Sequence, residues 1–439
     1  MISLLLGLNL HVAEATPLSL QDSLSLVATQ NPEVQIARLQ ADQSNLERLK
    51  VLTSVVSVQA SGSWLDFGEP LDSYILGDEN TEVDCSSFEA FGFGDLCASF
   101  SEPLRVRDDR IFDGSIQVAL PVSALYSIVQ GHTANQHLQN IKELETEQTK
   151  QRIELSVIDI YLQALELQAQ AKILNDTIHR LEKHQQSVRA FVAQGLAHPV
   201  QELELAHAIK QTTVGIRQVN QGYQLLCQQM ELLLGLSESF EPIEIQDTIL
   251  PPTEGSPNDS LSYKIAQQQY QAAQAGSQAA LGNMIPTIAL MAATTSTQGQ
   301  GPFTPTSQQY IGLSVQGDLA WGQKWMTYKQ RQLDVTIAKQ GLDLQQRALS
   351  LQQKQSKQAW EQAQEQIELA QEKIQIEQIK RDQAQVQFDN HQITTTDLLE
   401  AEAAFSEAQV TLLKVKHQHI VAQAKYQQSL NADTLYFAN

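Results

Sequence analysis

The 439 residues of this chain exceed what one hydrophobic core usually covers, so two domains or one elongated architecture are expected. Few Pro (13) and Gly (21) residues, with long stretches of Gln, Ala, Leu, Glu and Lys, favour long helices with solvated faces. The net charge of −21 and the lack of any Lys/Arg-rich block argue against nucleic-acid binding. The excess acid indicates either an acidic lumen or surface, or a helical protein kept soluble by its charge.

The N-terminal segment predicts export. Residues Ile2 to Leu10 form a short apolar run, and Ala13-Glu14-Ala15 follows as a site of the kind that signal peptidase cuts. We therefore assign residues 1–15 to a signal peptide. Beyond this leader no stretch of 18 or more consecutive apolar residues exists, so no transmembrane helix is expected and entry into a membrane would require strands.

An internal repeat organises the rest of the chain. Residues 115–210 match residues 312–406 at an offset of about 196. Pro32 to Trp64 fits Leu261 to Thr294 at an offset near 229, and the difference is an insertion between Leu65 and Asp113. Each half has the order helix, strand, loop, strand, very long helix, turn, shorter helix. The expected segments are a first structural repeat over 16–236, a linker over 237–258, and a second structural repeat over 259–439.

In the first repeat, a helix over 18–54 precedes a β-hairpin over 55–122. The strands are predicted from apolar residues that alternate with polar ones, as in Val56, Val58 and Ala60 against Ser57 and Gln59. Each strand has about 9 residues, which is enough to cross a bilayer when tilted.

The insertion between these two strands carries two of the three cysteines. Cys85 and Cys97 lie in a segment rich in Gly, Asp, Ser and Phe, which favours a disulfide in an oxidising compartment. Two unpaired loop thiols are the alternative. Cys227 lies on a helical stretch and is expected to be a small buried hydrophobe.

A very long helix is predicted from about Ser123 to Gln194, where apolar residues step alternately by four and three positions, as in a coiled-coil seam. About 70 helical residues span roughly 105 Å. A turn near 195–201 leads into a helix over 200–236 that is half as long. A long helix can therefore pack against two short helices stacked end to end.

The second repeat follows the same plan with a helix over 259–283, a β-hairpin over 286–317, a long helix over 321–390, a turn near 391–397 and a last helix over 397–431. Aromatic residues lie near the strand ends, where an interfacial girdle would be expected. They are Trp64, Phe67, Phe112, Phe303, Tyr310 and Trp321. The alternative is two ordinary hairpins packed on helices, with these aromatics as core. Four strands leave two edges, and in a bilayer no edge can stay unpaired, so closure would require several copies of the chain.

No motif for catalysis is present. The chain lacks G-x-x-x-x-G-K-[ST], C-x-x-C, H-E-x-x-H and G-x-S-x-G, so we expect no enzyme activity, no catalytic residue, no cofactor and no metal. His417 and His419 are two apart and His179 and His184 five apart, which favours solvated helix histidines over metal ligands.

The turn that begins at Phe388 and continues through Asp397-Leu398-Leu399-Glu400-Ala401 resembles that of the TolC family of outer-membrane efflux proteins, and the likeness in element order and duplication covers essentially the whole chain after the leader. The resemblance implies a mainly α fold with a small β part, in which four transmembrane strands per chain form a 12-stranded β-barrel in a homotrimer, continued by an α-helical barrel.

The same resemblance implies a function and partners. The chain would be the outer-membrane tunnel of a tripartite efflux or type I secretion system, with a periplasmic extension, and would serve as a passive exit duct for solutes or proteins. Its partners would be the lipid bilayer, a periplasmic adaptor (membrane fusion) protein and an inner-membrane pump of the RND or ABC type. The alternative is a periplasmic or surface coiled-coil structural protein without a pore.

Site residues are also implied by the resemblance. Asp397 and Glu400 would form acidic rings at a periplasmic gate; helix capping, with Thr395 or Thr396 as the cap, is the local alternative. Two departures from the family pattern are Ile393, which replaces a gate Arg, and His391, which replaces a Gly. Six residues beside the turns are candidates for adaptor contact, with helix packing as the alternative: Gly195, Leu196, Leu203, Leu205, Leu398 and Leu399.

Overall fold

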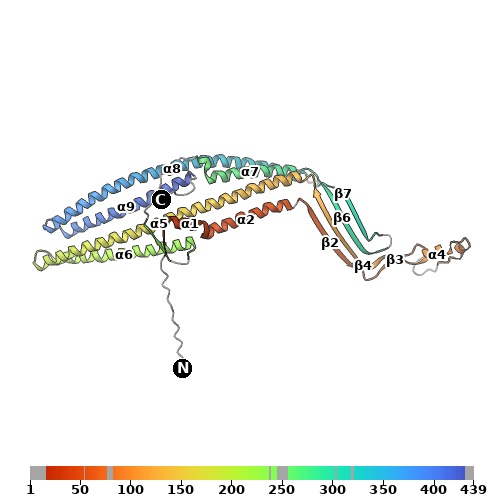
Figure 1. The fold of residues 1–439 in the computed structure, drawn as a ribbon, viewed down its shortest axis with the longest axis horizontal. Helices are drawn as coiled ribbons and strands as arrows, with labels where there is room; N and C mark the ends of the chain where they lie inside the picture. Colours follow the sequence, from red (N-terminus) through yellow and green to blue (C-terminus); the bar gives the residue numbers. More distant parts are fainter. Residues whose placement is uncertain are drawn as a thin grey trace, which may run out of the picture. The chain divides into compact units, whose positions relative to one another are not determined.

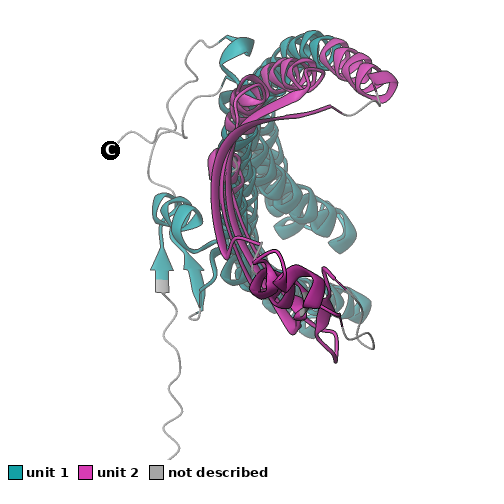
Figure 2. Ribbon diagram, turned by 90° about the vertical axis from the view of Figure 1, so that its right-hand side faces the viewer, with its two compact units in different colours: residues 1–44, 138–270, 338–439 teal, residues 45–137, 271–337 magenta. Residues whose placement is uncertain are grey.

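The computed structural model describes residues 16–53, 55–76, 83–236, 239–244, 256–301, 304–317 and 321–430. The expected signal peptide, most of the expected linker, Phe303 and the last nine positions lie outside the described residues. The chain divides into two units, which are coloured separately in Figure 2. Unit 1 contains residues 1–44, 138–270 and 338–439, and unit 2 contains residues 45–137 and 271–337.

Long helices dominate the chain, as the periodicity predicts (Figure 1). The two longest have 69 residues each, or roughly 100 Å, and the helices that follow them are about half as long. The main helices are α1 (Leu20–Gln30), α2 (Pro32–Thr53), α5 (Leu125–Ala193), α6 (Pro199–Leu234), α7 (Leu261–Gly282), α8 (Trp321–Asp389) and α9 (Thr395–Ser429).

The helix expected over 18–54 is wrong as a single element, because it breaks at Asn31. Pro32 cannot donate a backbone hydrogen bond, and it holds the preceding residue in an extended conformation, with ψ of 125° at Asn31. The Asn31 side chain accepts from the Val34 N–H at 3.0 Å and donates to the Leu233 carbonyl at 2.7 Å. One buried side chain thus begins α2 and ties it to α6.

The core of unit 1 gathers around Tyr161 of α5, which is fully buried. Its hydroxyl lies 2.9 Å from the Leu18 carbonyl and accepts from the Ile243 N–H at 2.9 Å. Leu18 ends β1 (Thr16–Leu18) and Ile243 follows β5 (Phe240–Pro242), and these two strands form a small parallel sheet. Tyr161 therefore fastens the start of the chain and the segment between the repeats to the same long helix.

Unit 2 contains an antiparallel sheet of order β2-β4-β6-β7. Its strands are β2 (Ser57–Asp66), β4 (Leu104–Pro121), β6 (Thr287–Gln300) and β7 (Ser307–Gln316), and the short β3 (Leu71–Ser73) pairs with the far end of β4. Both expected hairpins are present, and pairing of β4 with β6 joins them into one sheet. Among the described residues, β2 and β7 pair on one side only, so they form its edges.

Two strands are longer than the expected length of about 9 residues. β4 has 18 residues and β6 has 14. The alternation of apolar and polar residues stops near Asp113, whereas the hydrogen-bonded ladder continues into charged sequence as far as Leu104. Periodicity reports which face a side chain occupies, and it gives no signal where neither face is apolar.

The insertion between β2 and β4 carries two short helices, α3 (Ser86–Glu89) and α4 (Gly94–Ser101). Cys85 and Cys97 form a disulfide bond there, with Cα atoms 5.8 Å apart. The unpaired-thiol alternative therefore does not describe this structure. Cys227 is a free, buried cysteine on α6.

The sheet has two chemically different faces. The apolar face carries Val58, Trp64, Phe112, Ile116, Val118, Ile288, Leu290, Ile311, Leu313 and Val315. The polar face carries Ser61, Ser63, Asp113, Ser115, Gln117, Thr295, Thr297 and Gln308. Leu290 is 44% exposed, Ile116 52% and Trp64 62%. The alternative in which the aromatics form a soluble core is therefore wrong for Trp64, Phe112 and Trp321, which are all exposed in the chain.

Among the described residues, no helix is both long enough and apolar enough to cross a membrane.

Candidate functional site

The candidate site is the end of unit 1 where two helical hairpins turn, at residues 194–198 between α5 and α6 and at residues 390–394 between α8 and α9. Gly195 has φ of 72°, and the next N–H, of Leu196, donates back to the Phe191 carbonyl at 2.9 Å. His391 has φ of 59°, and Gln392 donates to the Gln387 carbonyl at 2.8 Å in the same way. The second turn thus keeps the left-handed geometry that a glycine would supply.

The two turns touch through aromatic rings. The rings of Phe191 and His391 lie edge to face, with centroids 4.5 Å apart. Beneath them, Leu181, Val188, Leu205, Ala384, Phe388 and Leu398 form a buried cluster, with Ile393 packed against it. The position occupied by an Arg in the family pattern therefore contributes apolar packing here, which accounts locally for Ile393.

Asp397 caps the helix on which it lies. Its carboxylate accepts from the Thr394 N–H at 2.8 Å and from the Thr394 hydroxyl at 2.7 Å, and that hydroxyl faces the Asp397 N–H at 3.2 Å. The hydrogen bonds from the Thr394 hydroxyl and backbone hold the pKa of Asp397 below its usual value. The expected caps, Thr395 and Thr396, are wrong because α9 begins at Thr395, two residues before the expected start at Asp397, and its cap is Thr394. The Thr395 side chain is buried.

The remaining turn candidates fall into two groups. Leu205 and Leu398 are completely buried inside the chain, so helix packing accounts for both. Leu196 and Leu203 are 60% and 68% exposed. Glu400 and Gly195 are also exposed, and Leu399 is partly buried against the cluster. Asp397 and Glu400 thus present two carboxylates to solvent one helical turn apart on α9.

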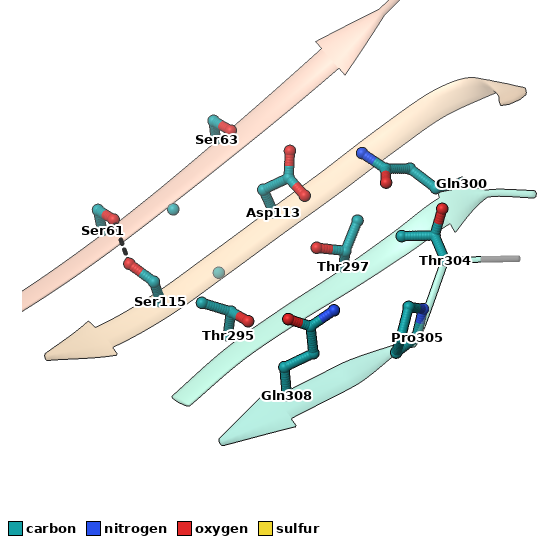
Figure 3. A pocket seen from close by; sticks show the side chains of 12 residues that line it. Ser61, Ser63, Asp113, Ser115, Thr295, Thr297, Gln300, Thr304, Pro305 and Gln308 are labelled. Carbon is teal, nitrogen blue, oxygen red and sulfur yellow. Dashed lines mark hydrogen bonds between the residues drawn. The ribbon is translucent and has the colours of Figure 1, made fainter. Parts of the chain in front are cut away.

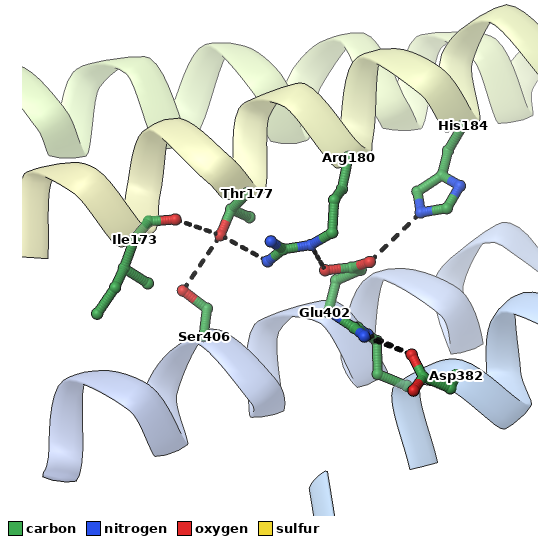
Figure 4. A network of polar contacts seen from close by, with 8 residues as sticks. Ile173, Thr177, Arg180, His184, Asp382, Glu402 and Ser406 are labelled. Atoms are coloured by element: carbon green, nitrogen blue, oxygen red, sulfur yellow. Dashed lines mark hydrogen bonds and ion pairs between the residues drawn. The ribbon is translucent and has the colours of Figure 1, made fainter. Parts of the chain in front are cut away.

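A buried carboxylate, Glu402, joins α9 to α5 one turn further along (Figure 4). Its side chain is 3% exposed and receives the Arg180 Nε–H at 2.7 Å, while His184 Nε2 lies 3.4 Å from its other oxygen. Burial pushes the pKa of Glu402 upward, but hydrogen bonds from His184 and Arg180 outweigh it and hold the pKa below its usual value. The charge is therefore retained inside the helical packing.

Further contacts extend this network to a third helix. The Arg180 guanidinium donates to Thr177 Oγ at 3.1 Å, and Thr177 lies 3.4 Å from the Ser406 hydroxyl. The guanidinium of Arg381 on α8 lies 4.4 Å from the centre of the Phe405 ring, and that of Arg180 lies 5.6 Å from it. Helices α5, α8 and α9 are thus held together by one polar and aromatic network.

A second polar link, which is partly buried, lies further from the turns. His417 of α9 has Nδ1 2.9 Å from Glu166 and Nε2 3.2 Å from Asp159, both on α5. Burial lowers the pKa of this imidazole, but the hydrogen bonds to Glu166 and Asp159 outweigh burial and raise the pKa above 6.5. The expectation of solvated histidines is wrong for His417 and His184, because each reaches carboxylates on a neighbouring helix; His179 is exposed.

Substitution His417→Gln is expected to lower the free energy of unfolding by about 1 kcal/mol at pH 6 and by less at pH 9. A raised folded-state pKa means that the stabilisation is complete below the unfolded value of 6.5 and is lost as pH rises through the folded pKa. Thermal unfolding followed by circular dichroism at both pH values measures this. His179→Gln is the matched control, and an equal effect of His417→Gln at both pH values would contradict the charged link.

These links could not be found from the sequence. Arg180 and Glu402 are 222 positions apart, and His417 and Glu166 are 251 apart. The apolar seam that contains Leu181 and Val188 gives no signal for these links, because its one polar position, Gln185, takes part in neither link. In the described residues, no group of three or more His, Cys, Asp or Glu side chains is arranged to hold a metal ion.

Comparison with known proteins identifies the fold. No protein-family model matches the chain. No curated protein matches it either. Solved structures do: the channel-forming CusC (TM-score 0.77, 13% identity, 94% of this chain and 91% of that chain), the outer-membrane protein VceC of Vibrio cholerae (0.73, 11%, 94% and 95%) and the outer-membrane channel CmeC of Campylobacter jejuni (0.75, 10%, 94% and 85%).

The coverage of nine-tenths of the chain shows that both units take part in the likeness. The expected fold class is therefore confirmed for the single chain, whose mainly α fold with a small β part matches the fold of these solved structures.

Proposed function

We propose that this chain is the outer-membrane channel of a tripartite efflux or type I secretion system, and that it acts as a passive exit duct rather than as an enzyme. The observation that carries the proposal is the sheet of unit 2, whose exposed apolar face lies opposite a polar face. A soluble protein would bury such a face, whereas lipid would cover it without cost. Outer-membrane strands that face lipid on one side and water on the other have this alternation.

The unpaired edges of the sheet support a homotrimer. An open edge cannot persist in hydrocarbon, so β2 of one copy would pair with β7 of the next and close a barrel. The helices offer a further contact surface. On α8, the exposed residues Ile337, Leu344 and Leu351 are spaced by seven, which is the spacing of a seam that packs against another helix.

The charges along the sheet support a membrane boundary. On the apolar face, Trp64 and Phe112 lie opposite each other, and the next pair on this face is Asp66 with Arg110, whose charged atoms are 3.4 Å apart. Aromatic rings followed at once by an ion pair are typical of the passage from hydrocarbon to water. We therefore place the sheet in the outer membrane and the helices in the periplasm.

The turns between helices would meet the other components. Leu196 and Leu203 expose large apolar side chains beside Gly195, which suits contact with a periplasmic adaptor protein that an inner-membrane pump of the RND or ABC type would engage. Leu399 is less accessible.

Asp397 and Glu400 would form the acidic constriction of this channel. Their carboxylates are exposed, and the cap hydrogen bonds that orient Asp397 keep it ionised at neutral pH. Replacing both with Ala is expected to lower cation selectivity and divalent block in planar bilayer recordings. If conductance, selectivity and divalent block all stay unchanged, the two carboxylates do not line the pore.

The competing function is a coiled-coil structural protein without a pore. Recordings with the purified wild-type protein separate the two. Stepwise conductance and heat-modifiable trimers in the membrane fraction are expected for a channel, whereas a pore-free protein that stays out of the membrane fraction would overturn the proposal.

A further inference from the structure

The inner part of the four-stranded ladder contains one residue that is charged at neutral pH. Over residues 57–65, 111–121, 287–298 and 307–316, the sole Asp, Glu, Lys or Arg is Asp113 of β4. In these ranges the rest of the polar face carries mostly hydroxyl, amide and small side chains, with Leu65, Ile111 and Met291 as larger apolar ones. Charges reappear at the next pair of the β2–β4 ladder, which is Asp66 with Arg110.

Asp113 occupies the middle of a belt of hydroxyl groups on the polar face (Figure 3). In the strand register it lies between Ser63 of β2 and Thr297 of β6. The neighbouring row contains Ser61 and Ser115, whose hydroxyl oxygens are 2.7 Å apart, and then Thr295 and Gln308. Together these residues line a depression of about 480 Å³.

None of the three arginines of β4 is paired with the Asp113 carboxylate. Arg105 pairs with Asp72 and Asp108, and Arg107 lies over the Phe67 ring. Arg110, three residues away on β4, is drawn to Asp66 at 3.4 Å and to Asp109 at 3.9 Å. Its position in the strand alternation also puts it on the apolar face, opposite to Asp113. Asp113 directly follows Phe112, so it lies at the level of the aromatic pair Trp64 and Phe112 but on the opposite face of β4. A carboxylate at this level that no cation neutralises is costly unless it faces water, which supports a hydrated polar face.

We propose that Asp113 is a selectivity residue of the channel, which attracts cations and cationic solutes into the strand-built part of the lumen. The inference rests on the proposed channel function. It concerns the sheet of unit 2, which is a different site from the carboxylates at the helical turns. One Asp113 from each copy would place a ring of negative charge on an otherwise neutral hydroxyl lining. Such a ring raises the local concentration of cations and lowers that of anions, most strongly at low ionic strength.

The test is the K⁺/Cl⁻ permeability ratio of the purified full chain in planar bilayers, obtained from reversal potentials across a KCl gradient. Asp113→Asn keeps the size of the side chain and is expected to lower the ratio at least about twofold at low salt, with a smaller change at 1 M salt. Asp113→Glu should keep the wild-type ratio. Asp95→Asn, which removes one exposed acidic charge from α4 in the insertion, is the matched control and should also keep it.

Cysteine labelling gives a second measurement that does not depend on the Asn variant. The native chain suits it, because Cys85 and Cys97 are bonded and Cys227 is buried. In Asp113→Cys, a water-soluble cationic thiol reagent should react and shift the ratio toward anions, whereas Ile116→Cys on the opposite face should stay unlabelled in the bilayer. Wild-type channels with an unchanged ratio in Asp113→Asn, or an unreactive thiol in Asp113→Cys, would overturn the inference, and absence of wild-type channels would overturn the proposed function instead.

Discussion

Replacing Glu402 with Gln is expected to lower the free energy of unfolding by about 3 kcal/mol at pH 7, because it leaves Arg180 and His184 without their shared carboxylate. Removal of one partner from a buried pair costs about 3 to 5 kcal/mol, and the lower end applies because the Arg180 side chain keeps 25% of its exposure. Thermal and urea unfolding of the purified protein, followed by circular dichroism, measures the loss.

The pH dependence of this effect follows from the lowered pKa of Glu402. A carboxyl with a depressed folded-state pKa contributes stability that is complete above its unfolded pKa, near 4.5, and is lost as pH falls through the folded value. The difference between wild type and Glu402→Gln should therefore shrink below pH 4.5. Glu400→Gln, two residues away and exposed, should change stability by less than about 0.5 kcal/mol.

A double variant separates the charge from the packing. Glu402→Leu combined with Arg180→Met removes both members of the pair and is expected to recover most of the stability that Glu402→Gln loses. The assignment of Glu402 as a charged link would be refuted by a loss in Glu402→Gln no greater than in Glu400→Gln.

Replacing Ile116 with Arg is expected to prevent membrane assembly, whereas replacing its neighbour Gln117 with Arg is expected to leave assembly intact. The two residues occupy successive positions of the central strand β4 and so point to opposite faces of the sheet. An Arg on the lipid face near the middle of a bilayer costs about 2 to 4 kcal/mol in each chain, and one that faces the water-filled side costs little. The two positions are adjacent in the sequence, but one side chain faces lipid and the other faces water.

Assembly is measured as heat-modifiable oligomers in the membrane fraction after expression of each variant. Loss in Ile116→Arg together with normal assembly in Gln117→Arg supports the apolar face as the lipid contact. The reverse pattern, or equal loss in both, would show that the two faces have been assigned wrongly.

The spacing of apolar residues in the sequence predicts the individual helices and strands of this chain. The seam through Ile153, Val157 and Ile160 predicts α5 because its period is that of one helix, and alternation in Val58 and Ala60 predicts β2 for the same reason. The repeat predicts that both patterns return in the second half. The predictions fail where another local feature decides the structure. Pro32 divides the first helix, and β4 continues through charged residues.

The candidate site is less accessible from sequence. The sequence places Asp397 beside the start of a helix. It does not show that Thr394 is the cap of that helix, because the cap depends on the backbone conformation of the turn. Leu205 and Leu398 resembled exposed contacts because they lie beside the turns, and the tertiary packing of two hairpins buries them.

Sequence alone determined the long helices, the four strands and the two faces of the sheet, since each follows from the spacing of residues within one element. Only the tertiary structure decided that Glu402 meets Arg180, that His417 meets Glu166, and that Asp113 lies in a row with Ser63 and Thr297. The physical reason is that these contacts join positions far apart in the chain, where register and helix rotation depend on packing and leave no local periodicity to read.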